Sequence, residues 1–320
     1  MTNTESITLD DDFLTSRLDQ ALSNSFPQYS RSQLQSFIKA GLVTVNGQVI
    51  SKQRHPVQAG DLLCFTAEAQ QQTEWAGEDI PLNIIYEDDQ LLIVDKPAPM
   101  VAHPGAGVHS GTLVNALLHH CPDLQQLPRA GLIHRLDKET TGLLVIAKTL
   151  TAHTYLSDQM QKRHIKRFYQ AVVQGSLVSG GTVDAAIGRH PTARTKMCVS
   201  QHGGRHAVTH YRILNRFRHH THLQLQLETG RTHQIRVHMM HIRHPIVGDP
   251  TYSREKIPRH ACETLKTTLQ QFRRQALHAY ELTLTHPVSG EEMTWTAPLP
   301  DDFQQLLCAL QHNETTDEPR

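Results

Sequence analysis

The sequence predicts a mixed α+β fold, in which a largely antiparallel sheet forms the main domain and a small ααβ module precedes it. From about residue 80 to residue 305 the chain contains many short β-type runs, with helical patterns between them. Residues 13–66 show a separate pattern of two helices followed by short strands. Strands and helices arranged in this way, with turn residues between them, are typical of the α+β class.

The strands of the main domain are predicted from short apolar runs. In residues 221–227 leucines alternate with polar side chains, as in a half-buried strand. Further strand-like runs are 91–94, 143–146, 169–173 and 208–214. Helical patterns lie at 112–119, 152–163 and 233–241. These elements together account for residues 80–305, which we predict to be one domain.

The module at residues 13–66 is predicted from helix and turn signals. Ser30 is a good N-cap for the second of its helices, over residues 31–40. Asn46 and Gly47 then join two short strands, because this dipeptide favours the tight turn of a β-hairpin. The pattern therefore predicts two helices packed on a small sheet.

Two segments are expected to lie outside these domains. Residues 67–79 are rich in Ala, Gln and Glu and are predicted to be a linker. Residues 311–320 have too little apolar content to fold and are predicted to be a disordered tail.

The composition argues against a membrane protein. No apolar run approaches the ~18 residues that a transmembrane helix needs. The first residues are polar and acidic, unlike the basic start and apolar stretch of a signal peptide. We therefore expect a soluble protein in the cytoplasm.

The net charge is zero, but its distribution suggests a nucleic-acid partner. Residues 129–260 contain 21 Lys and Arg and 7 Asp and Glu, a net charge of +14, and the rest of the chain balances it with −14. A basic block of this size in a neutral protein suggests one face that binds phosphates, although such runs can also be ordinary solvated surface.

The cysteines and histidines do not predict a metal site. The five cysteines include no Cys-x-x-Cys pair, which argues against a disulfide framework and against a zinc-thiolate site. Two histidine sets have regular spacing, but zinc ligation would need a continuous helix and a further carboxylate or thiolate. These sets are His202, His206 and His210, and His238, His241 and His244. The glycine-rich HPGAG lacks the lysine and the spacing of a phosphate loop, so no nucleotide cofactor is expected.

The stretch most informative about chemistry is GLIHRLDKETTG, residues 131–142, which leads into the apolar run LLVIAK. Asp137 lies there among cationic and small hydrogen-bonding residues, a suitable place for a fixed, ionised carboxylate. Taken alone, however, an Asp in a loop is usually a turn or cap residue.

HRLDKETTG resembles the signature loop of the RluA family of RNA pseudouridine synthases. KRFYQAVVQG, THYRIL, LETGRTHQIRVHM, HPIVGDPTY and RQALHA follow in the family's order, and IYEDDQLLIVDKP and HPGAG precede the loop. The resemblance covers about residues 13–305. It implies a catalytic domain of the pseudouridine synthase type and an enzyme that isomerises uridine to pseudouridine. KETTG and PRAGLIHRLD are closest to a member that modifies the helix 69 stem-loop of 23S ribosomal RNA.

The resemblance also implies roles for five residues. Asp137 matches the family's nucleophile, and Tyr169 matches the tyrosine that stacks on the target base and is a candidate for moving a proton. Arg231, in GRTHQIR, matches the basic residue that pairs with the aspartate and favours its charged form. Arg135 matches the arginine that enters the RNA stack beside the flipped base. Ile235 matches an apolar residue that lines the uracil pocket.

The N-terminal segment SRSQLQSFIKAGLVTVNGQVI, followed by VQAGD, resembles the S-four-like RNA-binding module. The resemblance implies an RNA-facing surface that includes Arg31, Lys39, Lys52 and Arg54. The alternative is a generic ααβ fold with ordinary surface charges.

These residue types suit the reaction. Uridine is joined to ribose through nitrogen and pseudouridine through carbon-5, so the enzyme must detach, turn and rejoin one base without any cofactor. A carboxylate can attack the ribose or the uracil ring, or assist glycal formation, and the sequence leaves these routes open. Access to a base in folded RNA requires base flipping, and an aromatic face that stacks on a base contributes about 1–3 kcal/mol.

Two other functions compete with this hypothesis. A non-catalytic RNA-binding assembly factor would use the module and the basic face alone, and would not need Asp137, Tyr169 and Arg231. A glycoside hydrolase needs two facing carboxylates, whereas only Asp137 has a motif around it. We therefore predict a monomeric enzyme that acts on 23S rRNA or on an assembling large ribosomal subunit, without a membrane, a metal or a small-molecule cofactor.

Overall fold

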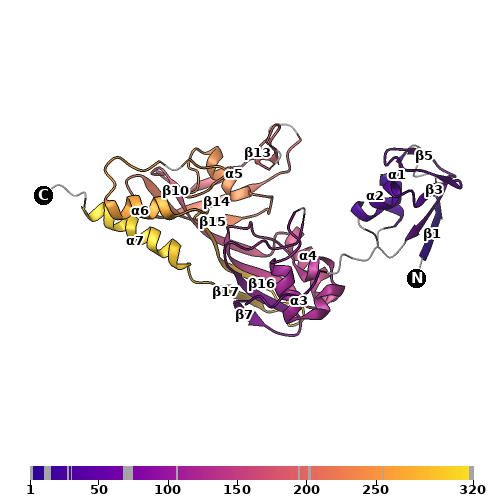
Figure 1. Cartoon of the computed structure of the whole chain (residues 1–320), viewed down its shortest axis with the longest axis horizontal. Coiled ribbons are helices and arrows are strands. Elements are labelled where there is room, and N and C mark those ends of the chain that lie inside the picture. The colour runs from indigo at the N-terminus through magenta and orange to yellow at the C-terminus, as the bar shows by residue number, and fades with distance from the viewer. Residues whose placement is uncertain are drawn as a thin grey trace. The chain divides into compact units, whose positions relative to one another are not determined.

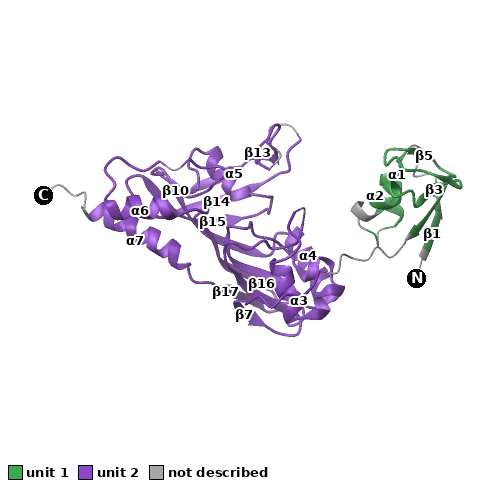
Figure 2. Cartoon of the chain, viewed as in Figure 1, with its two compact units in different colours: residues 1–74 green, residues 75–320 purple. Residues whose placement is uncertain are grey.

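The computed structural model describes residues 3–10, 16–26, 29, 31–67, 75–105, 107–193, 195–200, 203–254 and 256–316. The chain divides into two compact units, residues 1–74 (unit 1) and residues 75–320 (unit 2), as Figure 2 shows. Each unit has a hydrophobic core of its own.

Unit 1 is a small α+β module with an antiparallel sheet in the order β1-β6-β3-β4. Its helices bury Leu22, Leu34 and Ile38 against the sheet, where Phe65 is also buried. This burial of apolar area stabilises the module by roughly 25 cal/mol per Å². The elements are β1 (Asn3–Thr8), β2 (Ser16–Arg17), α1 (Leu18–Ser25), α2 (Arg31–Lys39), β3 (Val43–Val45), β4 (Gln48–Val49), β5 (Pro56–Val57) and β6 (Leu62–Ala67).

The second helix, the hairpin and the last strand expected in unit 1 are present. Asn46 and Gly47 have φ values of 51° and 80°, which a tight hairpin turn requires. One boundary differs, because residues 3–8 form β1 and pair with β6, whereas the module was expected to start at residue 13. The expected N-cap, Ser30, lies outside the described residues.

Unit 2 is built on a long sheet in the order β11-β14-β15-β10-β16-β9-β8-β7, with β17 paired to β16. Its described strand pairs are antiparallel except β16 and β9, which run parallel. The strands are β7 (Ile84–Glu87), β8 (Leu91–Lys96), β9 (Thr141–Ala147), β10 (Lys166–Gln174), β11 (Gly181–Asp184), β14 (Val208–Arg216), β15 (His220–Leu227), β16 (Leu277–Thr285) and β17 (Glu292–Thr296). A separate hairpin consists of β12 (Ile187–Arg189) and β13 (Met197–Val199).

The helices of unit 2 cover different parts of this sheet. Figure 1 shows α6 and α7 together beside the part that contains β10, and α3 and α4 at the other end of the unit. The helices are α3 (Leu113–His120), α4 (Leu150–Gln161), α5 (Gln234–His241), α6 (Glu263–Gln271) and α7 (Asp301–Thr316), with short 3₁₀ helices η2 (Pro122–Gln126) and η3 (Pro128–Gly131). The predicted α+β class, with a largely antiparallel sheet, is confirmed.

Strand β9 explains why the sequence of this region is apolar without interruption. Leu144 and Ile146 belong to one core, whereas Leu143 and Val145 belong to another on the opposite face. The strand is buried along its whole length. The loop that ends at β9 is therefore attached to a rigid element.

The expected linker at 67–79 is only partly present in the described residues. Residues 68–74 lie outside them. Trp75 packs against the core of unit 2, and the carboxylate of Glu78 accepts hydrogen bonds from the Gly111 amide at 3.0 and 3.1 Å. Unit 2 therefore begins at Trp75 and not at residue 80.

The expected disordered tail at 311–320 is wrong for residues 311–316, which continue α7. Asn313 is buried, and its Oδ1 accepts a hydrogen bond of 2.8 Å from the Cys262 amide. The polar composition was misleading because these residues extend a helix that Phe303 and Leu310 already anchor in the core. Residues 317–320 lie outside the described residues. Within the part of the chain that the structure describes, no helix is long and apolar enough to cross a bilayer.

Candidate active site

The predicted nucleophile lies in an open pocket of about 660 Å³ in unit 2. Three segments line it: the loop before β9, the start of β10, and the segment from the end of β15 into α5. Asp137, Tyr169 and Ile235, which are far apart in the sequence, are thereby brought together. A larger cavity of about 1180 Å³ is lined by Tyr252 and has no carboxylate among its described lining residues, so it offers no nucleophile of this kind.

The loop that carries Asp137 is fixed at both ends. Leu136 is buried in the core, and the carbonyl of Asp137 accepts a hydrogen bond of 3.0 Å from the Thr140 amide. Gly142 then enters β9 with φ of 115°, and an added Cβ would lie 2.2 Å from the carbonyl oxygen of Ala279 on β16. Only glycine allows this close approach, so the sheet itself fixes the end of the loop.

Lys96 also fixes this loop through hydrogen bonds to backbone carbonyls. It is fully buried, and its Nζ donates to the carbonyls of Pro97, Met100 and Lys138 at 2.9, 3.0 and 3.2 Å. Burial lowers the pKa of Lys96 to about 8, although the carboxylate of Asp137 acts in the opposite direction. Lys96 therefore ties the backbone next to Asp137 to the end of β8.

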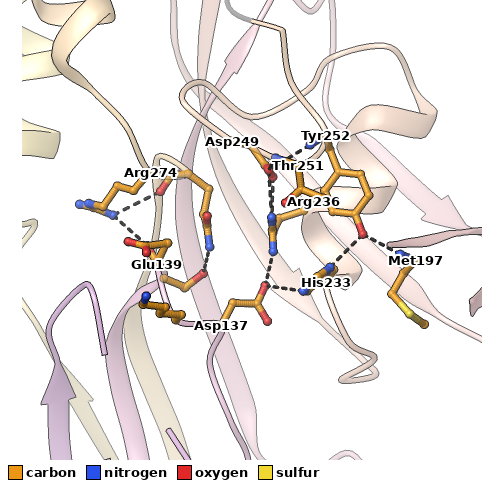
Figure 3. A network of polar contacts seen from close by, with 12 residues as sticks. Asp137, Glu139, Met197, His233, Arg236, Asp249, Thr251, Tyr252 and Arg274 are labelled. Atoms are coloured by element: carbon orange, nitrogen blue, oxygen red, sulfur yellow. Dashed lines mark hydrogen bonds and ion pairs between the residues drawn. The ribbon is translucent and has the colours of Figure 1, made fainter. Parts of the chain in front are cut away.

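A second tie connects the loop to α7. The Arg274 guanidinium forms two hydrogen bonds with the Asp302 carboxylate, at 2.6 and 2.7 Å, and its Nη1 is 3.5 Å from the carbonyl of Glu139. Gln275 donates to the hydroxyl of Thr140 at 2.9 Å. Figure 3 shows Arg274 beside Glu139.

The side chain of Asp137 pairs with Arg236 on α5. Nη1 of Arg236 donates to Oδ2 of Asp137 at 2.9 Å, and the Asp137 side chain is 18% exposed. The same guanidinium donates from Nε and Nη2 to both carboxylate oxygens of Asp249, at 2.7 and 2.9 Å. Asp249 is held in turn by the amides of Thr251 and Tyr252. The two carboxylates raise the pKa of Arg236 despite its burial, so the guanidinium is charged.

His233 and Tyr252 complete this network, as Figure 3 shows. Nε2 of His233 lies 3.9 Å from Oδ2 of Asp137, and Nδ1 is hydrogen-bonded to the hydroxyl of Tyr252 at 2.8 Å. That hydroxyl also accepts a hydrogen bond from the Met197 amide at 2.8 Å. Burial lowers the pKa of His233, and burial raises the pKa of Tyr252. Both side chains are therefore neutral near pH 7, and Arg236 is the cation in direct contact with Asp137.

The predicted pairing of Arg231 with Asp137 is not formed. Nε of Arg231 donates instead to the carbonyl of His206 at 3.0 Å. The reason is the start of α5: Arg231 lies before the helix, where its amide donates to the side chain of Gln234. Arg236 lies within the helix on the buried side, so it reaches the carboxylate. Arg231 nevertheless lines the same pocket.

Tyr169 and Ile235 are both buried at 4% exposure and line the pocket. Tyr169 lies in β10, between Leu225 of β15 and Ala279 of β16. Burial raises the pKa of Tyr169, so the phenol is neutral. These two apolar surfaces provide a place for a planar base near Asp137.

The remaining predicted residues are the cations Arg135, Arg31, Lys39, Lys52 and Arg54. Arg135 is exposed and lines the pocket. Lys39, Lys52 and Arg54 are exposed on unit 1, and Arg31 is in α2, but its side chain lies outside the described residues.

The described histidines of the two sets are not gathered into a metal-binding group. In the part of the chain that the structure describes, no group of three or more His, Cys, Asp or Glu side chains could hold a metal ion. His206 pairs with Asp184 at 3.3 Å, His210 with Glu228 at 2.7 Å, and His244 with the carbonyl of Gln174 at 2.8 Å. His202 lies outside the described residues.

Sequence reasoning missed Arg236, Asp249, Tyr252, His233 and Lys96. All five are in the quoted motifs GRTHQIR, GDPTY and IVDKP. The spacing of these motifs does not show which arginine pairs with Asp137, because GRTHQIR contains two. Only the position of the first turn of α5 distinguishes Arg231 from Arg236.

Comparisons with known proteins agree with this geometry. Residues 90–241 match the family model described as RNA pseudouridylate synthase, and residues 16–63 match the S4 domain. The ribosomal large subunit pseudouridine synthase D of Pseudomonas aeruginosa is 54% identical, covering 93% of this chain and 92% of the relative. The protein of the same description from Escherichia coli strain K12 is 52% identical, covering 94% and 92%.

A solved structure gives the same result for the fold. Human RNA Pseudouridylate Synthase Domain Containing 4 aligns with a TM-score of 0.56 and 26% identity, over 72% of this chain and 93% of that protein. The segment that matches the family model, residues 90–241, includes Asp137, Tyr169 and Arg236. From these similarities over nearly the whole length, together with the carboxylate-arginine pair in the pocket, we conclude that the chain belongs to the RNA pseudouridine synthase family and is an RNA pseudouridine synthase.

Proposed function

We propose that the protein converts uridines of 23S ribosomal RNA to pseudouridine, with the helix 69 stem-loop as its target and Asp137 as its nucleophile. The observation that carries the proposal is the Asp137 carboxylate, paired with Arg236 in a pocket that also contains Tyr169. The description of the relatives as large subunit pseudouridine synthases supports a ribosomal substrate.

The two oxygens of Asp137 have different surroundings. Oδ2 accepts the hydrogen bond from Arg236, while Oδ1 accepts none from the described residues. Oδ1 is therefore available to a substrate. Whether the carboxylate attacks the ribose, attacks the uracil ring or assists glycal formation, the reaction needs it charged and correctly oriented. Arg236 supplies a compensating charge, and Asp249 keeps that arginine in place.

The pocket fits a base that has been flipped out of the RNA. Tyr169 and Ile235, which line this pocket, are buried, and a base that remains stacked in a helix cannot reach them, so the nucleotide must leave the stack. Tyr169 offers a ring for stacking and Ile235 an apolar contact on the base. Arg135, exposed at the pocket, is long enough to occupy the space that the base leaves. The exchange rearranges one nucleoside and requires no cofactor.

Unit 1 is proposed to bind the ribosomal RNA outside the target nucleotide. Its match to the S4 domain and the exposed cations Lys39, Lys52 and Arg54 support this role. We propose that the substrate is 23S rRNA or the assembling large subunit, that the reaction takes place in the cytoplasm where subunits assemble, and that the enzyme works as a monomer.

The proposal is tested by mapping pseudouridines in the ribosomal RNA of a bacterial strain that lacks the gene. The expected result is loss of pseudouridine at helix 69, and its return with the wild-type gene but not with Asp137→Asn. Asp158→Asn is the matched control, because that carboxylate is half-buried on α4, pairs with Lys162 and does not line the pocket.

Two results would contradict the proposal. If the deletion removed pseudouridine from another RNA and left helix 69 unchanged, the substrate would be wrong. If Asp137→Asn restored the modification, Asp137 would not be the nucleophile, and a non-catalytic role in ribosome assembly would be the better account.

A further inference from the structure

Arg167 is a buried guanidinium that the network around Asp137 does not use. It lies on β10, two residues before Tyr169, so both side chains emerge on the same face of the sheet. It is 7% exposed and lines the same pocket as Asp137. Its Nε is buried without any hydrogen-bond partner among the described residues.

No carboxylate among the described residues of the pocket pairs with Arg167. The described lining of the pocket includes two acidic residues, Asp137 and Glu228. Asp137 pairs with Arg236, while Glu228 pairs with His210 and Arg163. A buried charge without a partner is costly, and in a functional pocket it points to a ligand that supplies the missing negative charge.

The residues around Arg167 leave space for its guanidinium and do not neutralise its charge. An added Cβ on Gly230 would lie 2.9 Å from Nη1 of Arg167, so glycine leaves the space that the guanidinium needs. His134, beside it, accepts a hydrogen bond from the Val145 amide at 3.4 Å, and burial lowers the pKa of His134 to about 3. This neutral imidazole adds no second charge.

We propose that Arg167 binds the uracil base of the target nucleotide and stabilises the negative charge that the base carries while it is detached from the ribose. This inference rests on the proposed function and names a further substrate-binding residue for it. When the C1′–N1 bond breaks, its electron pair remains on the uracil and is shared among N1, O2 and O4. After the base turns, carbon-5 forms the bond to C1′, the proton on carbon-5 is released, and N1 takes up a proton.

A base is favoured over a phosphate by the depth of Arg167. Arg135, Arg163 and Arg205 are more exposed around the pocket and are placed to meet the RNA backbone. Arg167 lies behind them, next to the buried ring of Tyr169. A planar guanidinium can donate two parallel hydrogen bonds, and a charged uracil offers acceptors in its plane.

The test compares wild type with Arg167→Met and Arg167→Lys in the full-length protein, under single-turnover conditions. The substrate is a helix 69 transcript that contains either uridine or 5-fluorouridine at the target. Fluorine makes the base more acidic and therefore a better leaving group. Because its carbon-5 carries no proton to release, the rate followed on both substrates is the loss of the N1-linked nucleoside, not the formation of pseudouridine. Arg216→Met is the matched control, because it removes an exposed cation of unit 2 outside the pocket.

We expect Arg167→Met to lower the rate on uridine by about 10²-fold, as does the loss of one donor to a developing oxyanion. The Kd for RNA should not change, and Arg167→Lys should retain part of the rate. The loss should be smaller on 5-fluorouridine, because the fluorinated base needs less stabilisation. If thermal unfolding shows that Arg167→Met does not fold, the rates on uridine and 5-fluorouridine are compared with Arg167→Lys instead.

Three results would overturn the inference: an unchanged rate, an equal loss on both bases, or a weaker Kd with a smaller salt dependence, which would indicate a phosphate contact. The comparison can be made on any RNA that the wild type modifies, so an error in the proposed helix 69 target would leave it valid. A wild type that modified no RNA would overturn both the proposed function and this inference.

Discussion

Asp137 and Arg236 are 99 positions apart in the chain, yet Nη1 of Arg236 lies 2.9 Å from Oδ2 of Asp137. Asp249, whose side chain is completely buried, holds the other two donating nitrogens of the same guanidinium. One arginine is thus shared between a fixed carboxylate and a reactive one. This arrangement orients Asp137 without occupying both of its oxygens.

Arg236→Lys is expected to lower the single-turnover rate by roughly 10²-fold or more, because lysine cannot form the three-nitrogen contact with Asp137 and Asp249. Arg231→Lys is the matched control within the same motif, and it should retain most of the rate, since the Arg231 side chain donates to the backbone carbonyl of His206 and not to Asp137. Pseudouridine formation and the Kd for RNA are measured for both. If both variants lost the same fraction of the single-turnover rate, Arg231 would be as important to Asp137 as Arg236 is, which would contradict the prediction.

Tyr169→Phe should keep most of the activity, while Tyr169→Leu should lose it. In the proposed complex the ring stacks on the base, and such stacking is worth about 1–3 kcal/mol. The phenol is buried and neutral, so its hydroxyl is not expected to exchange a proton readily. Single-turnover rates of the three proteins are compared on one transcript. An inactive Tyr169→Phe would mean that the hydroxyl takes part in the reaction.

A protein that contains only residues 75–320 should fold and remain active, but should bind ribosomal RNA more weakly. Unit 2 has its own core, whereas the exposed cations of unit 1 would be lost. Each lost phosphate contact should reduce the slope of log affinity against log salt by about 0.7–0.9. Affinities are measured over a range of salt concentrations. An identical affinity and slope in both proteins would exclude unit 1 from RNA binding.

Full activity is expected after dialysis against a strong chelator, with no added metal, nucleotide or folate. The reaction is an isomerisation, and Asp137 and Arg236 supply the nucleophile and its compensating charge. RNA folding is maintained with monovalent salt, and elemental analysis checks that metal has been removed. Activity that disappears and returns only with a stoichiometric transition metal would contradict the mechanism.

Unit 2 should lose stability as the pH falls from about 6.5 towards 4. Burial lowers the pKa of His220, His222 and His278 to about 4. In the unfolded chain their pKa is about 6.5, so the unfolded state takes up protons first on acidification and becomes favoured. The contribution is fully present above pH 6.5 and is lost as the pH approaches the folded pKa.

The pH dependence is measured by urea unfolding followed through tryptophan fluorescence, since both tryptophans, Trp75 and Trp295, lie in unit 2. His222→Gln should reduce the slope of unfolding free energy against pH by up to about 1.4 kcal/mol per pH unit. The exposed His219→Gln is the matched control. If both variants reduced the slope equally, burial of His222 would not be the cause.

The sequence by itself determined the fold class, the module at the N-terminus and the loop that carries Asp137. Each of these depends on local order in the chain. The Asn46-Gly47 dipeptide forms a turn through its own backbone preferences, and the alternation in β15 gives a strand with one buried face. The loop around Asp137 could be identified because its residues are consecutive.

Only the tertiary structure decided which cation meets Asp137, because that pairing joins a loop before β9 to a helix after β15. The register of α5 turns Arg236 towards the carboxylate and leaves Arg231 at the pocket's edge, and nothing in the spacing of GRTHQIR distinguishes the two. The same holds for residues 311–316, whose polar composition suggested a tail although Asn313 of α7 is buried and hydrogen-bonded to the Cys262 amide at the start of α6. Burial and hydrogen bonding between distant segments decide such cases, since they depend on which surfaces meet in the fold.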